Sequence, residues 1–112
     1  MKIYHNPRCR KSRETLALIE QKGVAHEVVE YLKAPPSARE LKNIIKMLDI
    51  DAFQLLRRGE TVFKEKYKGK ERSDDEWIKI MVENPVLIER PIVVKDAKAV
   101  IGRPPENVLE LM

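Results

Sequence analysis

The chain has 112 residues, of which 43% are apolar and 36% are charged, as expected of a single folded domain and not of a disordered chain. The net charge of +4 favours anionic partners only weakly. The basic residues are spread along the chain and aromatics make up 5%, so we expect no nucleic-acid partner. The single cysteine excludes an intrachain disulfide and a four-cysteine zinc site. No apolar run approaches the ~18 residues of a membrane span, and no signal-peptide pattern begins the chain, so we expect a cytoplasmic protein with no membrane partner.

The first third of the chain has the pattern of a strand, a helix and a second strand. Residues 2–5 read as a short strand, residues 9–22 have helical periodicity, and Gly23 supplies a stop. Residues 26–32 have the β-branched character of a strand. A strand, helix and strand in this order normally form a parallel pair. One face of the predicted helix carries Cys9, Ser12, Leu16 and Ile19.

A helical block is predicted over about residues 34–88. Ser37 with Glu40, and Ser73 with Glu76, have the spacing of capping boxes and predict the starts of two helices. The second of these helices ends at the Asn-Pro pair 84–85. Between them, we expect a short helix over 50–59 that ends at Gly59, followed by an irregular, solvated stretch over 60–72.

The last quarter predicts a hairpin and a terminal helix. Residues 90–94 form a compact apolar strand, 96–98 a turn, 99–102 the partner strand, and 105–112 a helix that begins with proline. The layout predicts an α/β protein with a thioredoxin-like fold, βαβ followed by ββα, with a helical insertion between the halves. We expect one domain over 1–112, with a core of about 1–33 and 89–112 and the insertion over about 34–88.

Cys9 stands just before the first helix, among the basic residues Arg8, Arg10 and Lys11 and close to His5. A helix N-terminus and nearby cations both lower a thiol pKa, so we expect a reactive thiolate. Ser12, one turn further, could donate a hydrogen bond from its hydroxyl to that thiolate. The alternative is a buried, inert cysteine. No metal site is expected, because the two histidines, His5 and His26, lie on different predicted strands and no local carboxylate pair completes a site.

Four segments resemble the glutaredoxin-coupled arsenate reductases of the ArsC family. They are YHNPRCRKSRETL at 4–16, LLRRG at 55–59, ENPVLIERPIVV at 83–94 and IGRPPENVLE at 101–110. Their order and spacing match the family over essentially the whole chain. The same thioredoxin-like group includes the Spx-type regulators.

The resemblance implies a set of site residues. Cys9 matches the nucleophile, and Arg57, Arg90 and Arg103 match the arginines that hold the oxyanion. Several guanidinium groups offset the repulsion between a thiolate and an oxyanion and can pair with two oxygens at once. The residues that match supporting positions are His5, Ser12 and Pro91, and the thioredoxin-like plan implies a cis bond before Pro91. Arg13 matches a family position without an assigned role, and Arg58 is assigned to solvent.

The implied function is an arsenate reductase-like oxidoreductase with no bound cofactor. Arsenate or a related oxyanion is the expected substrate, glutathione the co-substrate and glutaredoxin the protein partner. A lone cysteine fits this scheme, because a second thiol must come from outside. The alternatives are a glutathione-dependent thiol reductase with another substrate and an Spx-like regulator that binds RNA polymerase, although the C-x-x-S sequence cannot form that group's C-x-x-C switch. Arg10 and Lys11 replace smaller neutral residues of the family and predict a more cationic entrance.

Overall fold

The computed structural model describes all of residues 1–112. The chain forms two compact units, the first made of Met1–Pro35 with Arg90–Met112 and the second of Pro36–Glu89. None of the helices has both the length and the apolar character needed to cross a lipid bilayer.

The first unit is built on a four-stranded sheet with the order β2-β1-β3-β4. Strand β1 (Lys2–His5) pairs in parallel with β2 (Glu27–Glu30), and helix α1 (Arg10–Gln21) connects the two. Strand β3 (Ile92–Lys95) runs antiparallel to β1 and forms a hairpin with β4 (Lys98–Ile101). The predicted parallel pair and the predicted hairpin are both confirmed, and β1 lies at the centre of the sheet beside β3.

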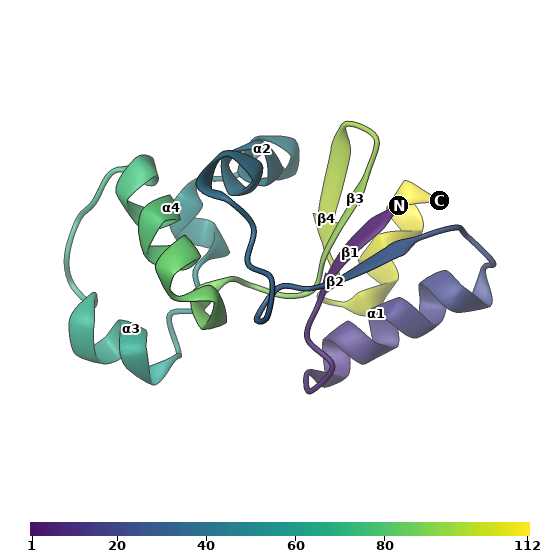
Figure 1. The fold of residues 1–112 in the computed structure, drawn as a ribbon, viewed down its shortest axis with the longest axis horizontal. Helices are drawn as coiled ribbons and strands as arrows, with labels where there is room; N and C mark the ends of the chain where they lie inside the picture. Colours follow the sequence, from purple (N-terminus) through teal and green to yellow (C-terminus); the bar gives the residue numbers. More distant parts are fainter. The chain divides into compact units, whose positions relative to one another are not determined.

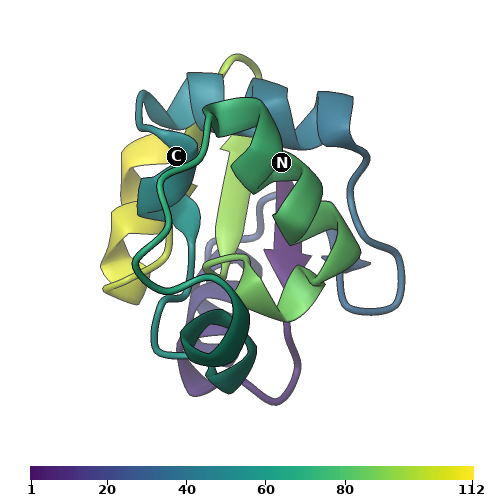
Figure 2. The same cartoon turned by 90° about the vertical axis from the view of Figure 1, so that its left-hand side faces the viewer.

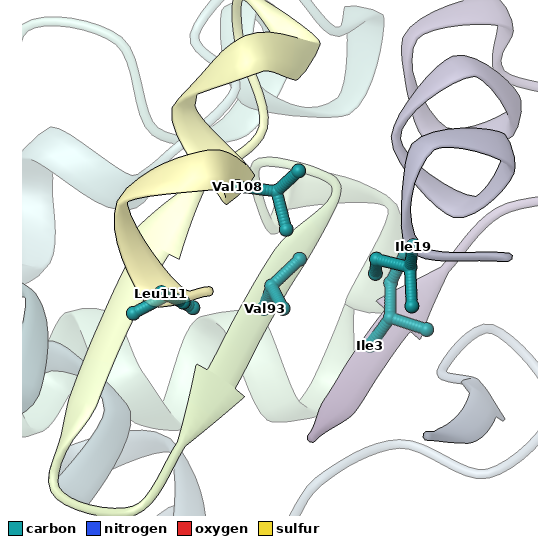
Figure 3. Packing of buried hydrophobic residues seen from close by; sticks show 5 residues of the cluster. All are labelled: Ile3, Ile19, Val93, Val108 and Leu111. Atoms are coloured by element: carbon teal, nitrogen blue, oxygen red, sulfur yellow. The ribbon is translucent and has the colours of Figure 1, made fainter. Parts of the chain in front are cut away.

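Helix α1 and the terminal 3-10 helix η3 (Pro105–Leu111) lie on the same face of this sheet (Figure 1). Apolar side chains from both helices and from the two central strands fill the space between these layers. Figure 3 shows this cluster, whose five members are Ile3, Ile19, Val93, Val108 and Leu111. The predicted apolar face of α1 therefore packs on the sheet, which fixes the position of the turn before that helix.

The arrangement confirms the predicted thioredoxin-like fold, with differences in the bounds or type of some elements. The hairpin strands are Ile92–Lys95 and Lys98–Ile101, where 90–94 and 99–102 were predicted. The second strand covers Glu27–Glu30 and not the full 26–32, and the terminal helix is 3-10 and not α-helical. Pro104 and Pro105 begin that helix, where a missing N–H costs no hydrogen bond.

The second unit is helical. Helix α2 (Ala38–Leu48) begins at the predicted cap, since the Ser37 hydroxyl accepts a hydrogen bond from the Glu40 N–H at 3.1 Å. Helix α4 (Asp74–Glu83) begins with the predicted capping box of Ser73 and packs against α2. Figure 2 turns these helices toward the viewer. A short 3-10 helix, η2 (Pro85–Leu87), follows the predicted end of α4.

Two predictions for the second unit were wrong. The short helix η1 covers only Ala52–Leu55, because Leu56 leaves it to form a bridge with Ile88. The predicted end at Gly59 is therefore incorrect, and Arg57 follows the helix. The stretch predicted to be irregular contains helix α3 (Thr61–Lys66), whose Phe63 is buried. The helix was missed because the many lysines of this stretch obscure its single buried apolar position, Phe63.

Candidate active site

Cys9 is the N-cap residue of α1, at the end of the turn that follows β1. Its N–H donates to the Asn6 carbonyl at 3.0 Å, and the Arg8 N–H donates to the Asn6 side chain at 3.0 Å. The turn therefore holds itself in shape through backbone and Asn6 contacts. It places a thiol that is 9% exposed next to the free N–H groups of the first helical turn.

Two arginines that are distant in sequence lie at this thiol. Arg103 Nη2 donates to Cys9 Sγ at 3.2 Å, and Arg103 Nε donates to the Arg90 carbonyl at 2.7 Å. The hairpin explains this meeting: Ile92 on β3 pairs with Ile101 on β4, so the residues just outside these positions share one end of the sheet. That end is also where β1 leads into the Cys9 turn.

The environment of Cys9 lowers the pKa of its thiol below the ordinary cysteine value. Burial is the largest influence and raises the pKa. The other influences lower the pKa and together outweigh the effect of burial. They are a hydrogen bond from the Ser12 backbone N–H, a hydrogen bond from the Arg90 side chain, and the charges of Arg103 and Arg90. A thiol with this set of donors favours the thiolate, which is the nucleophilic form.

The source of positive charge differs from the sequence-based prediction. Arg8, Arg10 and Lys11 are exposed, and none of them is among the influences on the Cys9 pKa. The Arg10 side chain is 83% exposed and pairs with Glu14 at 2.9 Å. These three side chains are exposed because they lie on the outer side of the Cys9 turn and of α1. The predicted helix start contributes as expected, but Arg90 and Arg103 supply the charge.

The Ser12 hydroxyl has a different role from the one predicted. Ser12 is completely buried; its Oγ lies 2.6 Å from His5 Nδ1 and accepts a hydrogen bond from the Asn6 N–H at 3.0 Å. Its backbone N–H, and not its hydroxyl, favours the thiolate. His5 is also buried, and this burial is the main cause that lowers its pKa and favours the neutral imidazole. The His5 and Ser12 side chains therefore support the Cys9 turn from its buried side.

Pro91 lies beside the site, and the Arg90–Pro91 bond is cis, as predicted. A second cis bond, Arg103–Pro104, was not predicted.

The Gly102 N–H donates to the Pro91 carbonyl at 2.9 Å. A Cβ on Gly102 would lie 2.5 Å from Thr15 Oγ1 and 2.8 Å from Pro91 Cγ, so only glycine fits this contact. Sequence reasoning missed Gly102, Thr15 and Asn6. The sequence did contain one signal for Gly102, because this glycine directly precedes the predicted site residue Arg103.

The structure brings most of the predicted residues together in the first unit. Those that gather around the Cys9 turn are His5, Cys9, Ser12, Arg90, Pro91 and Arg103. Arg57 belongs to the second unit, where its guanidinium pairs with Glu60 at 3.1 Å and with Glu89 at 2.9 Å.

Two further arginines that the sequence singles out, Arg13 and Arg58, have contacts of their own. Arg13 Nη1 donates to the Pro7 carbonyl at 3.0 Å and so supports the turn, which gives this residue a structural role. Arg58 is exposed, as predicted, and its guanidinium lies over the Phe53 ring at 4.7 Å.

The sequence matches the family model described as ArsC family over residues 4–111. An Escherichia coli K12 protein, the uncharacterized YfgD, is 50% identical over 100% of this chain and 96% of its own length. A protein named arsenate reductase from Neisseria meningitidis Z2491 is 43% identical over 96% of this chain and 94% of its own length.

A solved structure of an arsenate reductase from Vibrio cholerae has a TM-score of 0.95 and 47% identity, and the match covers 100% of this chain and 98% of that one. Both the sequence and the fold match over their whole lengths, with Cys9, Arg90 and Arg103 inside the matched range. The chain therefore belongs to the ArsC family.

Proposed function

We propose that this protein is an arsenate reductase that uses Cys9 as its nucleophile and takes further thiols from glutathione and glutaredoxin. The observation that carries the proposal is the Cys9 thiol at a helix start, with the Arg103 guanidinium 3.2 Å from Sγ and Arg90 beside it. The same groups that favour a thiolate are able to hold a second anion next to it. The names of the relatives at 43% and 47% identity support arsenate as that anion.

In the first step, the Cys9 thiolate attacks arsenic(V) and forms a sulfur–arsenic bond, while one arsenate oxygen leaves as water after protonation. Arg90 and Arg103 offset the repulsion between the two anions and stabilise the charge that builds up on the oxygens. Each guanidinium presents a planar set of N–H donors, which suits the oxygens of a tetrahedral oxyanion.

In the second step, a glutathione thiolate attacks the Cys9 sulfur of the adduct. The sulfur–arsenic bond breaks, its electron pair goes to arsenic, and arsenic(III) leaves as arsenite. The two thiols supply the two electrons and become one mixed disulfide between Cys9 and glutathione. A glutaredoxin thiolate then attacks the glutathione sulfur of this disulfide and returns Cys9 to the thiolate.

Arg57 is proposed as a third substrate-binding arginine on the resemblance alone. In the structure it pairs with two carboxylates, Glu60 and Glu89. If Arg57 binds the oxyanion, either its remaining N–H groups donate to the substrate while both ion pairs stay formed, or the substrate replaces one of the two carboxylates.

The test measures arsenate-dependent NADPH oxidation with glutathione, glutaredoxin and glutathione reductase. We expect turnover that needs both thiol components and that is lost in Cys9→Ser. The matched control is Arg39→Lys, an exposed change on α2 that should leave the rate unchanged. Absence of arsenate-dependent turnover in a correctly folded protein would contradict the proposal. If Cys9 still reduced glutathionylated substrates under those conditions, the thiol reductase alternative would replace it.

A further inference from the structure

The second unit contains a pocket of about 840 Å³ that has no part in the proposed chemistry of Cys9. It lies among η1, α3, α4 and the connection between the last two helices, which Figure 1 shows as a long, curved loop. Its volume falls within the roughly 300–1,000 Å³ that is usual for small-molecule sites. The size of the pocket is therefore suited to an organic molecule and larger than an inorganic oxyanion requires.

Aromatic rings line the floor of this pocket. Trp77 has its ring centroid 5.6 Å from that of Phe53 and 6.0 Å from that of Phe63. Trp77 and Phe63 are buried, but Phe53 remains 37% exposed. A flat apolar group could therefore pack on Phe53 and remove its exposed surface from water.

The rim of the pocket carries more positive than negative groups. Its cations are Arg58, Lys64, Lys68, Lys70 and Arg72, and its carboxylates are Asp51, Glu71 and Asp74. None of the ion pairs in the structure involves any of these cations. Among the carboxylates, Asp74 already accepts a hydrogen bond from the Ala52 N–H at 3.4 Å. Outside the rim, the Glu76 carboxylate of α4 also interacts electrostatically with Arg72. Five cations against three carboxylates still give the rim a net positive charge.

Two of these cations are held in place by aromatic rings. The Arg58 guanidinium lies 4.7 Å from the Phe53 ring centroid, and the Arg72 guanidinium lies 5.4 Å from that of Tyr67 and 5.7 Å from that of Trp77. Ring contacts orient a guanidinium without using its N–H donors. Arg72 Nε is buried and has no hydrogen-bond acceptor, and a buried donor without a partner is uncommon in a protein. An acceptor at the Arg72 guanidinium would therefore meet a side chain that the two rings already orient.

We propose that this pocket binds a small organic carboxylate with a flat apolar body. The body packs on the exposed Phe53 ring, next to the buried Trp77, and the carboxylate pairs with Arg58 and Arg72 at the rim. An inorganic anion would leave the aromatic floor unused, and a neutral apolar molecule would leave the unpaired cations unused. The charge and the shape of the pocket together select a ligand that has both parts.

Trp77 is the only tryptophan of the chain, so its indole N–H gives one resolved signal for the floor of the pocket. The experiment titrates the ¹⁵N-labelled full chain with 2-naphthoate and follows this signal by NMR. A parallel titration uses 2-naphthylmethylammonium, which keeps the ring and reverses the charge. We expect a saturable shift with 2-naphthoate and an affinity at least tenfold lower for the ammonium compound.

The variants Arg72→Gln and Arg58→Gln should each weaken 2-naphthoate binding at least fivefold. Lys79→Gln removes the same charge from an exposed position of α4 outside the pocket and should leave the affinity unchanged. The proposal is overturned if 2-naphthoate gives no saturable shift, if both compounds bind equally, or if Arg72→Gln and Lys79→Gln behave alike. Binding of a Phe-containing acidic hexapeptide, where 2-naphthoate fails to bind, would also overturn it in favour of a protein partner. The comparison of the two compounds on the unmodified chain decides the matter if a variant does not fold.

Discussion

At the scale of single residues, the groups that stabilise the Cys9 thiolate differ from those that stabilise the turn around it. The Ser12 N–H and two arginines act on the sulfur, whereas the Ser12 hydroxyl serves His5 and the Asn6 N–H. The hydrogen bonds to the Cys9 sulfur and those of the buried Ser12 hydroxyl are therefore independent. A mutation that removes one set should leave the other intact.

Ser12→Ala tests this separation. The change leaves the buried Asn6 N–H without its acceptor and His5 Nδ1 without its partner, so we expect a loss of about 1–3 kcal/mol in the free energy of unfolding. The Cys9 pKa should change little, because the backbone N–H at position 12 remains. Urea denaturation and a thiol titration measure the two quantities. A raised Cys9 pKa with unchanged stability would instead place the hydroxyl on the thiolate.

At the scale of elements, the β3–β4 hairpin carries the cationic part of the site. Its strand pairing puts Arg90 and Arg103 at one end, and the contact of Gly102 with Pro91 and Thr15 fixes that end against α1. A small change in this contact should therefore move both arginines at once.

Gly102→Ala should destabilise the protein by about 1–3 kcal/mol, because the added Cβ overlaps Thr15 and Pro91. It should also reduce arsenate turnover through displacement of Arg103. Gly59→Ala is the matched control, since a Cβ there has no atom within 4 Å. Thermal unfolding of both variants, and of Gly102→Ala combined with Thr15→Ala, measures the effect. Equal stability of the two single variants would show that the contact has room for a methyl group.

Local sequence patterns predicted the elements well where a cap, a stop or an alternating strand marks them. Both serine caps, the parallel pair and the hairpin follow from such signals. Helix α3 was missed because Phe63 is the only buried residue it offers among many charged ones. The charge at Cys9 was assigned to its neighbours in sequence, because pairing between distant strands cannot be read from local spacing. Only the resemblance to the family pointed to Arg90 and Arg103.

At the scale of the whole molecule, the arginines of the proposed oxyanion set belong to two compact units. Arg90 and Arg103 act directly on the Cys9 thiol, whereas Arg57 has ion pairs within its own unit. A contribution of Arg57 to turnover should therefore appear in kinetics and not in the properties of the free thiol.

Arg57→Lys and Arg90→Lys should each lower kcat/KM for arsenate at least about tenfold, or ~1.4 kcal/mol of transition-state stabilisation. Lysine keeps the charge but loses the planar set of donors. Arg57→Lys should leave the Cys9 pKa unchanged. Steady-state kinetics with Arg39→Lys as control provide the comparison. If Arg57→Lys turns over arsenate normally, Arg57 has no part in binding the substrate.

In the proposed chemistry, Cys9 is a thiolate nucleophile that Arg90, Arg103 and the helix start stabilise. The rate of Cys9 alkylation by iodoacetamide as a function of pH tests it most directly, since the reaction follows the thiolate fraction. The midpoint should lie below the ~8.5 of a free cysteine, and Arg103→Gln should shift it upward. Arg10→Gln, which removes an exposed charge nearer in sequence, should not shift it. A midpoint at or above ~8.5 in the unmodified chain, or an upward shift in Arg10→Gln and none in Arg103→Gln, would mean that Arg103 does not stabilise a thiolate at Cys9.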